Sequence, residues 1–239
     1  MAARNQTKAE EAIAQLKAEG LGPMNGDVIW LELDLKDPRN AKKAAEGFMK
    51  QEKRLDVLSH VISHIVLTRT LQPLLDQTAA EPDSDVRIVV VASDAHRFVS
   101  GETHFRNLDD LNKELKSSLS PTFARYCMTK LMNMLYAFEL QRRLTTAGSP
   151  ITVIALHPGA VNTFSNKPPL YHFEFINQGA YNSAFAAASE EVAEQREKYK
   201  GAYLTPVAKL TEPKKVAKDE GLAKELWDTV EKFLEEKEI

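Results

Sequence analysis

The sequence has few of the features that mark secreted, membrane-spanning or nucleic-acid-binding proteins. Its 239 residues include one cysteine, Cys127, so no disulfide can form within the chain, and we expect a reducing, cytoplasmic setting. No apolar run approaches the ~18 residues that a transmembrane helix needs, and the N-terminus has no apolar signal region. A net charge of −3 provides no basic excess for nucleic acid. A soluble globular protein is therefore expected.

What the sequence does contain is the pattern of one α/β domain. Hydrophobic residues make up 43% and charged residues 27%, both ordinary for a globular protein. Apolar strand patterns alternate with amphipathic helix patterns, and strands are expected at residues 28–33, 55–58, 86–91, 151–159 and 201–206. Strands that are apolar on both faces are typical of a parallel sheet covered by helices on both sides. We therefore expect a single domain over residues 1–239 with a doubly wound, Rossmann-like parallel sheet.

Two pairs of side chains at helical spacing could carry chemistry. In the helix expected from Pro121 to Gly148, Tyr126 and Lys130 are four residues apart and share one face. A cation beside a phenol lowers its ordinary pKa of about 10, which would let the phenol exchange a proton near neutral pH. The alternative is an amphipathic tyrosine at the edge of the core and a solvated lysine. His60 and His64 have the same spacing, but with no third ligand nearby no metal site is expected.

Four motifs together resemble the short-chain dehydrogenase/reductase family, in the branch that includes retinol-dehydrogenase-like and WW-domain-oxidoreductase-like enzymes. They are VVVASDAH with Ser93, YCMTK with Tyr126 and Lys130, HPGAVNT with Pro158, Gly159 and Thr163, and AARN with Arg4 and Asn5. The resemblance covers nearly the whole chain. It implies an oxidoreductase that interconverts an alcohol and a carbonyl group by hydride transfer, with a small-molecule substrate and a nicotinamide cofactor.

The resemblance also implies a role for each catalytic candidate. Ser93 would hydrogen-bond the substrate oxygen, Tyr126 would give or take the proton on it, and Lys130 would support the phenol and hold the nicotinamide ribose. Ligands of open parallel sheets bind at the carboxyl ends of the strands, so these residues and Pro158 are expected to converge there. The alternative for Ser93 is that it only caps the end of a strand.

The cofactor contacts follow from the same resemblance. Four residues after the strand at 151–159 would line the nicotinamide and pyrophosphate: Pro158, Gly159, Val161 and Thr163. Arg4, beside Asn5, lies where the family reads the adenosine ribose, and a guanidinium there can pair with a 2′-phosphate, which favours NADP(H) over NAD. Asp34, followed by Leu35, resembles the acidic adenine contact. The alternatives are an exposed arginine near a chain end, a plain loop threonine and a turn aspartate.

Three features of the family are missing from the sequence. There is no TGxxxGxG run and no opening strand, which in the family lies between the strand of Arg4 and the strand at 55–58. There is no NNAG segment, so the strand at 55–58 runs into the helix expected from Ser59 without the usual connection of about two to six residues. His60 replaces the family's helix asparagine. We therefore expect a Rossmann-like sheet that lacks a central strand, an N-terminal truncation and an internal deletion at 58/59, arising from splicing or from an incomplete gene model.

Three functions are compatible with these observations. The first is an NADP(H)-dependent alcohol or carbonyl oxidoreductase. The second is a truncated, non-catalytic remnant with weak or no cofactor binding that persists by associating with another chain. The third is a binding module for a small apolar ligand under a lid at 160–178, whose aromatic residues also hint at a bulky apolar substrate: Phe164, Tyr171, Phe173 and Phe175. A homo-oligomer is left open.

Overall fold

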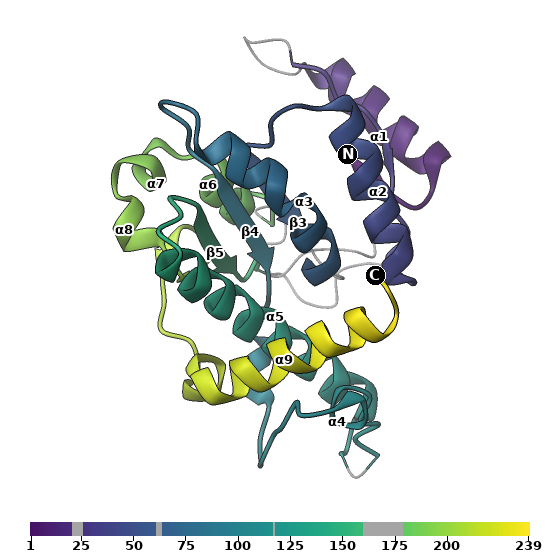
Figure 1. Cartoon of the computed structure of the whole chain (residues 1–239), viewed down its shortest axis with the longest axis vertical. Coiled ribbons are helices and arrows are strands. Elements are labelled where there is room, and N and C mark those ends of the chain that lie inside the picture. Colours follow the sequence, from purple (N-terminus) through teal and green to yellow (C-terminus); the bar gives the residue numbers. More distant parts are fainter. Residues whose placement is uncertain (21–25, 61–63, 117, 160–178) are drawn as a thin grey trace.

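The strands of the protein form two separate sheets. The computed structural model describes residues 1–20, 26–60, 64–116, 118–159 and 179–239. Within these residues, β1 (Ala2–Ala3) pairs in parallel with β2 (Leu31–Glu32) as a two-stranded sheet. The second sheet has the order β3-β4-β5-β6-β7, with β3 to β6 parallel and β7 antiparallel (Figure 1). Its strands are β3 (Val57–His60), β4 (Arg87–Val91), β5 (Thr152–Leu156), β6 (Ala202–Thr205) and β7 (Lys209–Leu210). The predicted α/β class with a mostly parallel sheet is confirmed.

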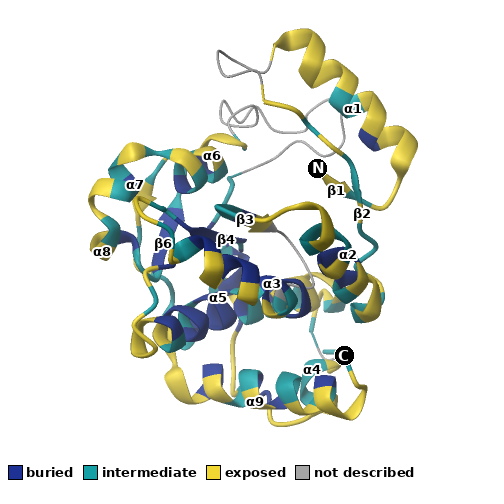
Figure 2. Cartoon of the chain, turned by 45° about the horizontal axis from the view of Figure 1, so that its top comes forward, coloured by how far each residue is buried: buried dark blue, intermediate teal, exposed yellow. Residues whose placement is uncertain are grey.

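Helices cover both faces of the five-stranded sheet. The helices of the described residues are α1 (Gln6–Glu19), α2 (Pro38–Gln51), α3 (His64–Ala79), α4 (Leu108–Leu111), α5 (Pro121–Thr146), α6 (Tyr181–Ala188), α7 (Glu190–Glu194), α8 (Arg196–Tyr199) and α9 (Glu220–Glu236), with 3₁₀ turns η1 (Asp94–Phe98) and η3 (Lys215–Lys218). Helices α3 and α5 pack on one face of the sheet, and α6 and α8 pack on the other. On β4, Ile88 and Val90 pack in the cluster that contains α3, α5 and α9, whereas Val89 packs with α6 and α8. This alternation places one apolar layer on each face, and β4, β5 and α5 form the buried centre (Figure 2).

The predicted starts of two helices are confirmed by their capping geometry. Asp37 Oδ1 accepts a hydrogen bond from the Arg39 N–H at 2.9 Å, and α2 begins at Pro38. Helix α5 begins at Pro121, where no backbone N–H is needed. Helix α1 is capped by Asn5, whose Oδ1 accepts from the Lys8 N–H at 2.9 Å. Local sequence therefore determines where these helices begin.

The strand predicted at 55–58 and the helix predicted from Ser59 are both displaced in the structure. Strand β3 continues through His60, since Ser59 and His60 pair with Val89 and Val90 of β4, and α3 begins at His64. The ladder with β4 outweighs the helical pattern of these residues. The prediction of His60 in a helix, one turn before His64, is therefore wrong, and so is the direct join of strand to helix at 58/59.

The strand predicted at 28–33 is much shorter than its apolar pattern suggested. Only Leu31 and Glu32 form a ladder, and their partner β1 is itself two residues long. No described strand joins this sheet to β3, which is the edge of the five-stranded sheet. A strand extends only as far as it has a partner, so β2 ends where β1 ends.

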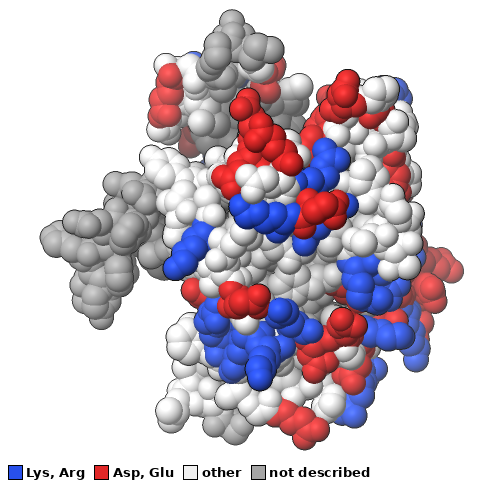
Figure 3. All heavy atoms as spheres, turned by 90° about the vertical axis from the view of Figure 1, so that its left-hand side faces the viewer, with Lys and Arg blue, Asp and Glu red and all other residues white. Residues whose placement is uncertain are grey.

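The face of the molecule that carries α7 and α8 has charged side chains of both signs lying side by side (Figure 3). A cavity of about 590 Å³ lies on this side, between α5 and residues 198–223, and it is lined by both Lys200 and Glu212. None of the candidate site residues lines it. It is therefore separate from the chemistry that the motifs predict.

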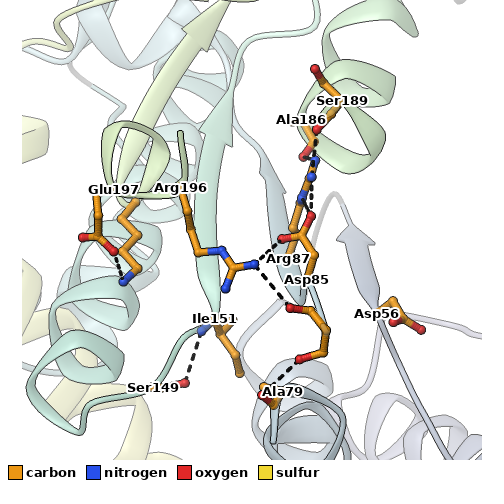
Figure 4. A network of polar contacts seen from close by, with 12 residues as sticks. Asp56, Ala79, Asp85, Arg87, Ser149, Ile151, Ala186, Ser189, Arg196 and Glu197 are labelled. Carbon is orange, nitrogen blue, oxygen red and sulfur yellow. Dashed lines mark hydrogen bonds and ion pairs between the residues drawn. The ribbon is translucent and has the colours of Figure 1, made fainter. Parts of the chain in front are cut away.

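A buried arginine fixes the amino end of β4. The Arg87 guanidinium binds the Asp85 carboxylate, donates to Ala186 O at 3.2 Å and donates to Ser189 O at 2.8 Å. Arg196 reaches the same carboxylate at 3.4 Å (Figure 4). The guanidinium thereby joins β4 to the end of α6 and the start of α7, at the end of the strand opposite to Ser93.

Candidate active site

The structure brings Tyr126 and Lys130 together at the carboxyl end of β4. The Lys130 ammonium lies 5.7 Å from the centroid of the Tyr126 ring and donates to the carbonyl oxygen of Val91, the last residue of β4, at 3.2 Å. The side chain is only 6% exposed, and this burial lowers the pKa of Lys130. Lys130 is therefore not the solvated residue of the alternative interpretation.

Ser93 follows the same strand end, two residues after Val91. It is 8% exposed, and its Oγ accepts a hydrogen bond from the Ala95 N–H at 3.1 Å. The hydroxyl therefore caps η1, but its own proton remains available for a further acceptor. Capping and substrate binding are compatible uses of this hydroxyl.

Three aromatic rings form a row that ends at Tyr126. The Phe123 ring centroid lies 6.3 Å from that of Tyr126, and the Phe98 ring centroid lies 5.7 Å from that of Phe123. All three are exposed, by 68% for Phe98, 48% for Phe123 and 44% for Tyr126. The sequence analysis missed Phe98 and Phe123. The available signal was the spacing of three residues between Phe123 and Tyr126, which puts both on one helix face.

The carboxyl end of β5 carries the predicted Pro158 and Gly159. Gly159 has φ +93°, and a Cβ there would lie 3.0 Å from Pro206 Cγ, so both backbone and space require glycine. Fully buried Asn182 holds this region, because its Nδ2 donates to His157 O at 2.8 Å and to Leu204 O at 3.1 Å. Asn182 was also missed, since it has no motif around it. Val161 and Thr163, and the proposed lid at 160–178, lie outside the described residues.

A polar cluster supports the loop after Ser93. Asp94 Oδ1 accepts from Arg97 Nε at 2.9 Å and from the Tyr203 hydroxyl at 3.0 Å. Burial opposes the charge on Asp94, but these two hydrogen bonds outweigh it, and the pKa of Asp94 lies below its ordinary value. His157, whose Nδ1 has no hydrogen-bond partner among the described residues, has its pKa lowered by burial. The cluster holds η1, which carries Phe98, against β6.

The residues predicted to bind the adenosine end lie at the carboxyl ends of β1 and β2, on the smaller sheet. Arg4 is exposed directly after β1, and the side-chain oxygen of Asn5 is already used as the cap of α1. Asp34 Oδ1 accepts from the Lys36 N–H at 3.1 Å, as a turn aspartate does. Leu35 packs against the apolar core. The structure thus places the predicted residues in two groups, one on each sheet.

The side chains present fit one end of a nicotinamide dinucleotide. A buried ammonium beside a phenol at the strand end suits the nicotinamide ribose. The sequence contains no glycine-rich turn for the pyrophosphate. Among the described residues, no group of three or more potential metal ligands lies close together.

None of the helices in the described part of the chain is long and apolar enough to cross a bilayer.

Comparison with known proteins identifies relatives along almost the whole chain, although no family model matches it. A short-chain dehydrogenase/reductase of Armillaria gallica is 37% identical in an alignment of 273 positions, gaps included, which covers 99% of this chain and 84% of that protein. Retinol dehydrogenase 14 of Mus musculus is 32% identical over 97% of this chain and 76% of its own length. A crystal structure of a protein from Mycobacterium paratuberculosis superposes with a TM-score of 0.64 at 27% identity, covering 97% of this chain and 82% of the other. Together with the strand-end site, these relatives show that the chain belongs to the short-chain dehydrogenase/reductase family of oxidoreductases.

Proposed function

We propose that the protein interconverts an alcohol and a carbonyl group in an NADP(H)-dependent reaction, with Tyr126 as the acid and base. The observation that carries this proposal is the buried Lys130 ammonium, 5.7 Å from the Tyr126 ring centroid, at the strand end that leads to Ser93. The names of relatives support an alcohol or carbonyl reaction with a nicotinamide cofactor, since one is a retinol dehydrogenase, and a structural neighbour with a TM-score of 0.61 is an NADH-dependent reductase solved with NAD.

Each residue has a distinct task in this proposal. A bound nicotinamide cofactor supplies or accepts the hydride at the substrate carbon. In the reductive direction Ser93 donates a hydrogen bond to the carbonyl oxygen, and Tyr126 gives that oxygen its phenolic proton. The Lys130 ammonium stabilises the negative charge left on the phenol oxygen. In the oxidative direction the phenolate takes the proton from the alcohol.

The cofactor contacts divide between the two sheets. Lys130 would hold the nicotinamide ribose. The nicotinamide and pyrophosphate would be lined by Pro158, Gly159, Val161 and Thr163. Arg4, with Asn5, would meet the adenosine ribose, where its guanidinium favours a 2′-phosphate, and Asp34 with Leu35 would border the adenine. Exposure of Arg4 without a carboxylate partner among the described residues supports this assignment.

The test is a titration with NADPH followed by its fluorescence, combined with turnover of apolar aldehydes and ketones. We expect saturable binding, loss of turnover in Tyr126→Phe and retention of NADPH binding in that variant. Tyr181→Phe is the matched control, since Tyr181 is an exposed tyrosine on α6. Arg4→Ala is expected to weaken NADPH more than NADH, whereas Lys8→Ala, which removes another exposed cation, should not. No saturable binding of either nucleotide would overturn the proposal.

The substrate that this site suits best is bulky and apolar. The row of Phe98, Phe123 and Tyr126 leaves two phenyl rings in water beside the proposed acid, and a flat apolar substrate would cover them. Phe123→Ser is expected to raise KM for large apolar aldehydes and to leave KM for small ones unchanged. An equal rise for both classes would contradict this role.

The split sheet favours one competing function, a non-catalytic remnant. Strand β3 has no partner on one edge, and β1 pairs only with β2 in the described residues. A remnant would be unstable or aggregated alone, so sedimentation and heat scanning distinguish the two. A monodisperse chain that melts cooperatively and binds NADPH supports the enzyme, whereas a chain that binds no nucleotide supports the remnant.

A further inference from the structure

An apolar cavity separates the two sheets. It has a volume of about 330 Å³ and lies between Ala2 of β1 and Leu31 of β2 on one side and Leu58 and Ser59 of β3 on the other. Helices α2 and α3 close it with Phe48 and other side chains. Apart from Ser59, every residue that lines it is apolar.

The strand edges beside this cavity carry backbone groups that no other described residue pairs with. The Arg87 N–H donates to Asp56 O at 2.8 Å, and alternate residues of a strand direct their backbone groups to opposite edges. The N–H and C=O groups of Val57 and Ser59 therefore point away from β4, where no described residue bonds them.

Strand β1 has a matching open edge. The carbonyl oxygens of Met1 and Ala3 accept from Leu31 and Leu33 of the β2 segment at 2.8 and 3.2 Å. By the same alternation the backbone groups of Ala2 point away from β2. Within the described parts of the chain, two strand edges with unpaired donors and acceptors thus border one apolar cavity.

We propose that this cavity binds an extended apolar strand from another polypeptide, parallel to β3. Ala2 and Ser59 are exposed, so water reaches these backbone groups in the free protein. A peptide strand would replace that water with main-chain bonds on both edges, whereas a lipid or small hydrocarbon would displace the water and leave the donors and acceptors unpaired. The apolar lining requires apolar side chains on the incoming strand, as in parallel strands covered on both sides. The strand adds main-chain bonds to an exposed sheet edge, a known mode of peptide recognition. It would connect the two sheets into one.

The chain contains a natural reporter of this event. The Trp30 indole N–H donates to Ala3 O at 3.0 Å, so the indole lies against β1. The second tryptophan, Trp227, stacks on Tyr136 of α5, and a Trp227→Phe background leaves Trp30 as the single indole.

The probe is a synthetic peptide of about eight residues, with a valine- and isoleucine-rich centre and terminal lysines. The matched control is the same peptide with one central residue replaced by proline, which removes one backbone N–H and breaks the strand pairing. We expect a saturable change of Trp30 emission and a higher melting temperature with the first peptide and neither with the second.

Variants of Ser59 test the site itself. Ser59→Pro removes an N–H that points to the cavity and leaves the β3–β4 bonds intact, so the peptide affinity should fall by about tenfold or more. Ser59→Ala keeps that N–H and should bind as the parent does.

The proposal is overturned if the two peptides have equal effects, or if the Ser59→Pro and Ser59→Ala variants bind the first peptide equally well. It is also overturned if a non-ionic detergent causes the same change of Trp30 emission as the peptide. A stable dimer in sedimentation that the peptide does not affect would overturn it too. If Ser59→Pro fails to fold, the comparison of the two peptides decides. The readout uses no nucleotide, so it is independent of the proposed enzymatic function.

Discussion

Replacing Lys130 by methionine should separate catalysis from stability. The ammonium is buried, and in the described part of the chain no carboxylate forms an ion pair with it. The ammonium donates to Val91 O at 3.2 Å, and Asn133 Nδ2 also donates to that oxygen at 3.4 Å. The carbonyl therefore keeps a donor when the lysine is removed.

The magnitude follows from opposing contributions. A hydrogen bond from a charged donor stabilises the folded state by about 1.5–3 kcal/mol. Burying the ammonium away from water opposes this, at a cost of roughly several kcal/mol. Methionine fills a similar volume without that desolvation. We therefore expect the free energy of unfolding of Lys130→Met to stay within about 1 kcal/mol of the parent or to increase.

Turnover should change in the opposite direction. Without the ammonium the phenolate of Tyr126 loses the positive charge that lies 5.7 Å from its ring centroid. Removing such support from a proton-transfer group lowers rates by about 10²–10⁴-fold. The assay is urea denaturation together with turnover per folded molecule, with Lys8→Met as an exposed control. A loss of more than about 2 kcal/mol of stability with full turnover would show that Lys130 is a structural residue and would refute the reasoning.

Three further outcomes are expected. Asn182→Leu removes the Nδ2 donor of His157 O and the Oδ1 acceptor of the Ala208 N–H, while Leu204 O keeps its bond from the His157 N–H. Urea denaturation should show a loss of about 2–4 kcal/mol; an unchanged midpoint would contradict this. Arg87→Met breaks the buried contact with the loop before β4 and should lower the unfolding free energy by about 3 kcal/mol, while a loss below about 0.5 kcal/mol would show that water replaces it. A hydrogen bond with Glu102, and a weaker one with Glu225, raise the pKa of His104. The stabilisation of the fold by protonated His104 is therefore fully present below about pH 6.5 and is lost as the pH rises through the raised pKa. A pH series of urea midpoints should show this fall, and His104→Gln should remove it.

The features that local sequence dictates were predictable. Asp37 and Pro121 define helix starts because a cap and a fixed φ act within one turn. The pairing of Tyr126 with Lys130 follows from the helical repeat alone. The buried strands β4 and β5 were recognisable because parallel strands covered on both sides are apolar throughout.

The features that depend on distant partners were not predictable. Ser59 lies in a strand because it pairs with Val89 of β4, which is distant in the sequence. The sequence around Ser59 has no turn signal that would mark the end of the strand. Asn182 satisfies carbonyl groups of two other strands, which no local pattern encodes. The exposed Phe98 follows a serine motif, but its position beside Phe123 depends on how η1 packs on α5.

The two-stranded ladder has a consequence for dynamics. Helix α1 buries only Ala9 among its residues, and β1 and β2 share a ladder of two residue pairs, so little free energy holds this N-terminal unit closed. Its amides should exchange with solvent through local opening, far faster than those of β4 and β5. Any nucleotide that contacts Arg4 would first have to order the segment that carries it, and part of its intrinsic affinity would be consumed in that ordering.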